Sequence, residues 1–197
     1  MYDDQFCTKN IGMRSYIRLI CYLYLALIST SCVEQRKVRK IMSEFVETEI
    51  VIPDDLECIY KRNISGIRKD TLKPNKLIVF YDTSDCSSCR ISHLIDLYPI
   101  YDMADTSGFS VLTIFSPKPE DVKDVILQLT IADHLMPIYV DATGEFNRLN
   151  QNIPSDLRFH SFLLDENNKP IFVGNPLSSY KLLELFTETI KVHHINN

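Results

Sequence analysis

Residues 76–98 read Lys76-Leu-Ile-Val-Phe-Tyr-Asp-Thr-Ser-Asp-Cys-Ser-Ser-Cys-Arg-Ile-Ser-His-Leu-Ile-Asp-Leu-Tyr98. Residues 77–81 are a continuous apolar run, rich in β-branched and aromatic side chains, which is typical of a strand covered on both faces. Residues 83–85 carry side chains suited to a helix N-cap, and apolar residues then recur at helical spacing as far as Tyr98. We therefore expect a buried strand that leads directly into a helix, with Cys86 in its first turn and Cys89 one turn later.

This placement of the cysteine pair has a chemical consequence. Unpaired N–H groups and the dipole at a helix start favour the thiolate of Cys86 over its thiol, and the thiolate is the form that attacks a disulfide. Cys89 is close enough in sequence to resolve a mixed disulfide by closing an intramolecular one. The spacing alone leaves open a structural disulfide or half of a zinc site, whereas the position between strand and helix favours redox chemistry.

Residues 1–31 have the pattern of a signal peptide. An apolar run at residues 19–28 follows Arg14 and Arg18, and small residues precede Cys32. Such an ending resembles the lipobox of bacterial lipoproteins, which implies that Cys32 is acylated and becomes the mature N-terminus. An uncleaved membrane anchor is the alternative, and both interpretations export the domain. Met13 begins a more conventional signal peptide than Met1, so we expect that translation starts at residue 13.

The remaining chain has the length of a single domain. We expect a membrane-proximal linker or helix at residues 32–49, a folded domain at 50–192 and a tail at 193–197. The formal net charge of −5 argues against nucleic-acid binding, and the basic cluster at residues 36–40 suits lipid headgroups next to the anchor. Cys58 is expected to be a small buried hydrophobe in its own strand.

The pattern predicts alternating strands and helices along the domain. A helix is expected from Val38 to Ile50, and residues 63–76 are expected to be a loop. Pro99 is expected to kink or end the cysteine-bearing helix. Further elements follow in this order: a strand at 110–115, a helix beginning near 117–119, a short strand at 137–141, a short helix at 143–150, a hairpin at 161–174 and a last helix capped by Ser178 or Ser179.

The chain resembles the TlpA/ResA group of membrane-anchored thioredoxin-like thiol-disulfide oxidoreductases. The resemblance rests on Cys86-Ser-Ser-Cys89 after its strand, on Ser161-Phe-Leu-Leu-Asp165 and on the strand and helix inserted before the hairpin. It implies an α/β thioredoxin-like fold, a central mixed sheet with flanking helices, an N-terminal extension and a β-α insertion. It also implies disulfide exchange with partner proteins at the cell envelope: Cys86 attacks, Cys89 resolves, and His160 with Ser161 forms the substrate loop.

Several positions differ from the family pattern and support alternatives. His160 stands where the family has a cis-proline, Phe80 where thioredoxins have a buried acid, and Asp85 where an aromatic residue is usual. A non-catalytic thioredoxin-fold module that binds a partner is therefore a second hypothesis. Others are a soft-metal site and a peroxidase built on Thr83, Cys86 and Arg158. We expect no cofactor and no metal, although the soft-metal alternative would use Cys86, Cys89, His93 and His160.

Overall fold

The structure is a computed structural model that describes residues 35–193 and 195. The expected signal peptide at residues 1–31, the start at Met13 and the lipidation of Cys32 lie outside the described residues. Residues 35–45 are helical, so the helix ends at residue 45 and not at Ile50 as predicted, and the chain from Glu44 onward forms one compact unit. Among the described residues, no helix has the length and apolar character needed to cross a membrane. The domain boundaries predicted from sequence stay predictions.

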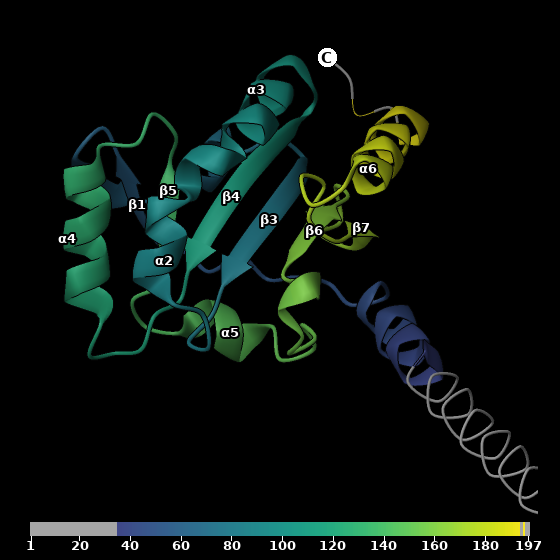
Figure 1. The fold of residues 1–197 in the computed structure, drawn as a ribbon, viewed down its shortest axis with the longest axis horizontal. Helices are drawn as coiled ribbons and strands as arrows, with labels where there is room; N and C mark the ends of the chain where they lie inside the picture. Colours follow the sequence, from purple (N-terminus) through teal and green to yellow (C-terminus); the bar gives the residue numbers. More distant parts are fainter. Residues whose placement is uncertain (1–34, 194, 196–197) are drawn as a thin grey trace, which may run out of the picture. The chain divides into compact units, whose positions relative to one another are not determined.

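The compact unit is built on a seven-stranded mixed sheet with the strand order β2-β1-β5-β4-β3-β6-β7 (Figure 1). β3 (Asn75–Tyr81) is an interior strand, parallel to the middle strand β4 (Phe109–Phe115) and antiparallel to β6 (Ser161–Leu164). β5 (Ile138–Val140) pairs parallel with β4, and β7 (Pro170–Val173) pairs antiparallel with β6. β1 (Glu57–Tyr60) and β2 (Asn63–Gly66) complete the other edge as an antiparallel pair.

This topology is that of the thioredoxin fold. A parallel β3 and β4 pair is followed by the antiparallel hairpin of β6 and β7 and by the last helix, α6 (Tyr180–Val192). α4 (Val122–Ala132) follows β4, and the inserted strand and helix are β5 and α5 (Glu145–Leu149). The α/β thioredoxin-like fold predicted from the sequence is thus confirmed.

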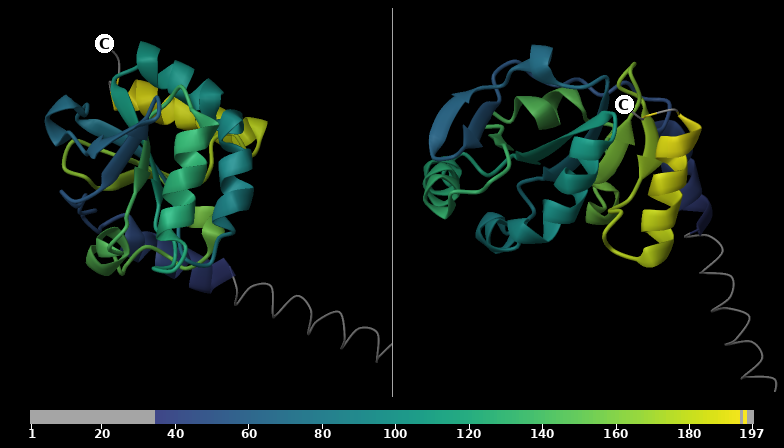
Figure 2. Two further views of the ribbon diagram at one scale, coloured as in Figure 1. Left: turned by 90° about the vertical axis from the view of Figure 1, so that its left-hand side faces the viewer. Right: turned by 90° about the horizontal axis from the view of Figure 1, so that it is seen from above.

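The side chains of β3 alternate between two apolar layers, as expected for a central strand. Leu77 and Val79 join a core with residues of α4, α6 and the helices after the cysteine pair. Figure 2 shows these helices on one side of the sheet. Ile78 and Phe80 are buried on the opposite side of the strand. The strand that precedes the cysteines is therefore fixed on both faces.

The segment after the cysteines differs from the prediction. α2 (Ser87–Ser92) is short and is followed by the 3-10 helix η2 (Leu94–Leu97) and by α3 (Tyr98–Thr106). Pro99 lies in the first turn of α3, so it belongs to the start of a new helix, whereas we expected it to kink or end the cysteine-bearing helix. The physical reason is that proline lacks only an N–H that the first helical turn leaves unpaired, and its fixed φ suits that position.

The predicted loop at residues 63–76 was also partly wrong. It contains β2, the 3-10 helix η1 (Lys69–Thr71) and the first residues of β3. β2 reads Asn-Ile-Ser-Gly, and all four residues are exposed, so the sequence offers no alternation of apolar and polar residues that would predict a strand. The strand forms because it completes the hydrogen bonds of β1. In a different hairpin, the turn between β6 and β7, Asn168 has a positive φ of 57°.

Candidate functional site

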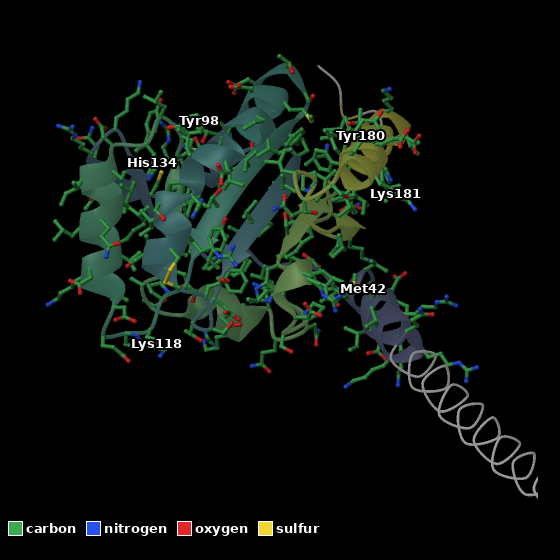
Figure 3. All side chains as sticks on the ribbon, in the orientation of Figure 1. Met42, Tyr98, Lys118, His134, Tyr180 and Lys181 are labelled. Atoms are coloured by element: carbon green, nitrogen blue, oxygen red, sulfur yellow. A yellow bond between two sulfur atoms is a disulfide. The ribbon has the colours of Figure 1, made fainter. Side chains whose placement is uncertain are left out.

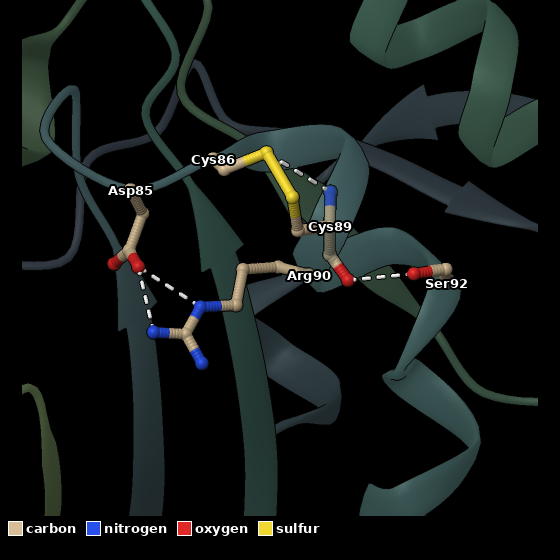
Figure 4. Close-up of a disulfide and its surroundings, with 5 residues drawn as sticks. All are labelled: Asp85, Cys86, Cys89, Arg90 and Ser92. Atoms are coloured by element: carbon tan, nitrogen blue, oxygen red, sulfur yellow. Dashed lines mark hydrogen bonds and ion pairs between the residues drawn. A yellow bond between two sulfur atoms is a disulfide. The ribbon is translucent and has the colours of Figure 1, made fainter.

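The cysteine pair forms a disulfide at the carboxyl end of β3. Cys86 is the N-cap residue of α2, and its sulfur is bonded to that of Cys89, with 5.3 Å between the two Cα atoms. Both residues are exposed. The disulfide is the yellow bond at the end of α2 in Figure 3 and is enlarged in Figure 4. A partner's thiol can therefore reach it from solvent.

The backbone around Cys86 favours negative charge on its sulfur. The Cys89 amide donates a hydrogen bond to the Cys86 Sγ atom over 3.4 Å. A donor held in this position stabilises a thiolate more than a thiol. We expected capping by residues 83–85, but the N-cap is the cysteine itself. Asp82 instead stabilises the turn before α2, where its Oδ1 atom accepts from the Ser84 amide over 2.8 Å.

The carboxylate next to Cys86 is compensated by an arginine. Asp85 Oδ1 accepts from Arg90 Nε over 2.9 Å and lies 2.8 Å from Arg90 Nη2, as Figure 4 shows. The Asp85 side chain is 5% exposed. The guanidinium also lies over the ring of Tyr81, 5.3 Å from its centroid, and burial raises the pKa of Tyr81. The negative charge of Asp85 is thus paired with Arg90.

A groove adjoins the disulfide on the side of Cys86. It has a volume of about 390 Å³. Its walls are residues 83–88, the loop after β4 and the first turns of α4, and they include Pro117, Lys118, Asp121 and Val125. A polar groove of this kind has room for a segment of a partner chain beside the sulfur.

His160 and Ser161 lie at the start of β6. The His160 ring is 4% exposed, and its Nε2 atom lies 2.9 Å from the carbonyl oxygen of Pro154. Its backbone N–H and C=O bond to Leu157 and Phe80, and no described peptide bond is cis. Ser161 is buried, and its hydroxyl has no partner among the described residues. His160 lines a cavity that does not include the cysteines. The predicted substrate-loop role of both residues stays a prediction.

The other predicted side chains have partners of their own. His93 is exposed, and its Nδ1 atom lies 3.2 Å from a carboxylate oxygen of Asp96. Arg158, the arginine of the peroxidase alternative, forms an ion pair with Asp156. Cys58 is the free cysteine of the described chain and is half-buried, less covered than we expected. Burial raises the pKa of its thiol, against hydrogen bonds from Ser65 and Tyr139 that lower it.

Two functional candidates were missed from the sequence. Arg90 lies five residues after its partner Asp85, a spacing that does not bring side chains together on a regular helix. Asp82 approaches His160 only because β3 and β6 are neighbouring strands, with Val79 opposite Ser161. Asp82 itself carries a local signal, since an aspartate in a turn commonly accepts a hydrogen bond from the backbone amide two residues later.

Comparisons with known proteins give only distant likenesses. No family model matches the chain, and no curated protein matches it. Among solved structures, StoA from Bacillus subtilis is 19% identical, covers 68% of this chain and 99% of its own, and has a TM-score of 0.45. The thioredoxin domain of a thiol-disulfide oxidoreductase from Bacteroides vulgatus is 17% identical, with coverage of 71% and 99% and a TM-score of 0.41. AhpC from Mycobacterium tuberculosis is 15% identical, with coverage of 72% and 99% and a TM-score of 0.43.

Proposed function

We propose that this protein is an exported, lipid-anchored thiol-disulfide oxidoreductase that exchanges disulfides with partner proteins through Cys86 and Cys89. The observation that supports it most is the exposed disulfide across the first turn of α2, beside a groove. A disulfide that only braces the fold has no need of exposure or of a helix start.

The exchange is a transfer of two electrons. In the reducing direction, the Cys86 thiolate attacks a disulfide sulfur of the partner, forms a mixed disulfide and releases the first partner thiolate. The Cys89 thiolate then attacks the Cys86 sulfur, closes the intramolecular disulfide and releases the second partner thiolate. The reverse sequence oxidises a partner dithiol and leaves both cysteines reduced. In either direction, the Cys89 amide stabilises the charge on Cys86 as it develops.

The location at the cell envelope is supported by sequence features alone. The apolar run at residues 19–28, the small residues before Cys32 and the basic cluster at 36–40 fit a lipoprotein leader and a membrane-proximal segment. Mass spectrometry of the N-terminal peptide should find acylated Cys32 as the first residue. A mature chain that retains residues 19–28 would contradict the lipid anchor.

A trapping experiment tests the exchange. In a Cys58→Ser background, Cys89→Ser leaves Cys86 unable to close its intramolecular disulfide, so mixed disulfides with partner proteins should accumulate in cells. They should disappear on reduction. The matched control adds Cys86→Ser and should trap nothing. If the Cys89→Ser chain traps no more protein than this control, disulfide exchange is excluded under those conditions.

One observation favours a second candidate, a non-catalytic module that binds a partner at the cell surface. The backbone N–H and C=O of His160 are both used inside the domain, by Leu157 and Phe80. They are therefore not available to pair with an extended substrate at the position that the family resemblance implies. This candidate predicts that the partner is captured equally well when both cysteines are serine. The control chain of the trapping experiment tests this, if the captured proteins are analysed without a reduction step.

A further inference from the structure

Three side chains outside the disulfide chemistry converge beside the turn from β3 to α2. Asp82, Asp85 and His160 each place one potential ligand atom within 4.8 Å of the other two. The two aspartates belong to one turn, closed by a hydrogen bond of 3.1 Å from the Asp85 amide to the Asp82 carbonyl. His160 comes from the chain before β6, which pairs with β3. The fold therefore unites groups that lie far apart in the sequence.

The His160 ring is the group that points to a ligand. It is 4% exposed, and its Nε2 atom lies 2.9 Å from the Pro154 carbonyl, which can only accept a hydrogen bond. In the neutral ring the proton is therefore on Nε2, and the lone pair is on Nδ1. The Nδ1 atom is buried and has no hydrogen-bond partner among the described residues. A buried lone pair without a partner is unfavourable, and a bound cation would satisfy it.

Both carboxylates are held in the same way, with one atom fixed by a neighbour. Asp85 uses Oδ1 for both nitrogens of Arg90. Asp82 uses Oδ1 for the amide and the hydroxyl of Ser84, at 2.8 and 2.6 Å. No hydrogen bond of the described chain is made to either Oδ2 atom. Metal-binding residues in proteins are commonly oriented by such supporting hydrogen bonds, as His160 is by Pro154.

We propose that Asp82, Asp85 and His160 bind one divalent cation of the borderline class to which Zn²⁺ belongs. One imidazole nitrogen and two carboxylate oxygens suit such an ion, whereas Ca²⁺ and Mg²⁺ prefer oxygen alone and Cu⁺ prefers sulfur. Zinc bonds of about 2.0–2.2 Å bring neighbouring ligand atoms to roughly 3.3 Å, so the two carboxylates turn inward on binding.

The site has an access route and an open coordination position. Asp82 and His160 line a cavity of about 500 Å³ whose walls also include Phe80, Gly144, Arg148 and Gln151. Three protein ligands leave a fourth position for water or for a donor atom of a bound molecule. Asp85, the third ligand, lines the groove beside Cys86 and not this cavity.

Zinc titration of the oxidised, full-length protein tests the proposal. The intact disulfide keeps the sulfurs of Cys86 and Cys89 from binding the metal, and serine in place of the other four cysteines of the full chain (Cys7, Cys21, Cys32 and Cys58) removes every other thiol. After dialysis against a chelator, isothermal titration should show one Zn²⁺ bound per chain. His160→Gln and Asp82→Asn should each weaken binding at least about tenfold, because each removes one of three ligands. Co²⁺ in place of Zn²⁺ should give visible absorption without a sulfur charge-transfer band.

The matched control is His93→Gln. His93 also lies beside a carboxylate, Asp96, but both side chains are exposed, so its loss should leave zinc affinity within about twofold. Circular dichroism in the presence of chelator checks that each variant folds. If His160→Gln does not fold, the zinc affinity of Asp82→Asn alone tests the proposal. Absence of stoichiometric binding overturns the proposal. Binding that Asp82→Asn leaves unchanged overturns it equally, as does binding that His93→Gln abolishes. None of these outcomes depends on disulfide exchange.

Discussion

Arg90 should contribute far more to stability than an ordinary surface arginine, because of the carboxylate that it covers. Arg90→Ala removes two hydrogen bonds to the Asp85 carboxylate, whose side chain is 5% exposed, and the contact with the Tyr81 ring. Hydrogen bonds to charged groups contribute about 1.5–3 kcal/mol each. Arg90 itself is 45% exposed, which reduces this contribution through solvent screening. We therefore expect a loss of about 2–3 kcal/mol in the free energy of unfolding.

The assay is urea unfolding of the oxidised protein, followed by far-ultraviolet circular dichroism. Arg158→Ala is the matched control, since Arg158 also binds an aspartate, Asp156, but the two side chains are 73% and 38% exposed. It should lose less than about 1 kcal/mol. Adding Asp85→Asn to Arg90→Ala should recover part of the loss, because no unpaired charge then remains buried. Equal, small losses for Arg90→Ala and Arg158→Ala would refute the reasoning.

Three further predictions follow from buried groups. After reduction, iodoacetamide at neutral pH should modify Cys86 about tenfold faster than Cys58, whose pKa burial raises, and peptide mass spectrometry would show it. Phe80→Ala should lower the free energy of unfolding by about 3–4 kcal/mol in urea, because Phe80 is 2% exposed and packs on Phe146 and His160. Burial raises the pKa of the Asp141 carboxyl above its usual value of 3.8. The free energy of unfolding should therefore fall as the pH rises from 3.8 through the pKa of Asp141 in the folded protein. Asp141→Asn should flatten this fall in acid titrations.

The sign of the Asp141 prediction follows from proton binding. Because the folded state holds the proton to a higher pH than the unfolded state, ionisation favours unfolding in that window. Asp141 is nevertheless well bonded: it accepts from the Ser116 hydroxyl and from the amides of Glu145 and Phe146. Asp141→Ala would leave these donors without an acceptor and should cost about 2–4 kcal/mol, measured in the same urea assay. A steeper fall with pH in Asp141→Asn would contradict this account.

The central architecture could be predicted because its signals are local. The apolar run of β3, the cysteine spacing and the hairpin at Ser161–Leu164 and Pro170–Val173 are each contained in a few adjacent residues. β2 could not be predicted, because its exposed, polar residues form a strand only beside β1. Pro99 was ambiguous, since proline both ends helices and begins them.

The site was only partly visible in the sequence for a related reason. The cysteine pair is a local pattern, and its place at a strand end followed from the residues around it. The pairing of Asp85 with Arg90 depends on how the turn at residues 82–85 leads into α2, and the approach of His160 to Asp82 depends on which strands are neighbours. Neither of these two contacts can be predicted from the spacing of the residues in the sequence. The likeness to a family identified His160 as a position of interest but not the atoms that it contacts.

The reduction potential of the Cys86–Cys89 pair tests the proposed function most directly. The full-length protein is equilibrated in glutathione or dithiothreitol buffers of defined ratio, its free thiols are alkylated, and the oxidised fraction is measured by mass spectrometry. We predict a reversible transition with the slope of a two-electron couple and a midpoint between about −270 and −120 mV, the range of thioredoxin-fold oxidoreductases. A disulfide that resists excess dithiothreitol until the protein unfolds, or one that does not re-form after reduction, would contradict the account.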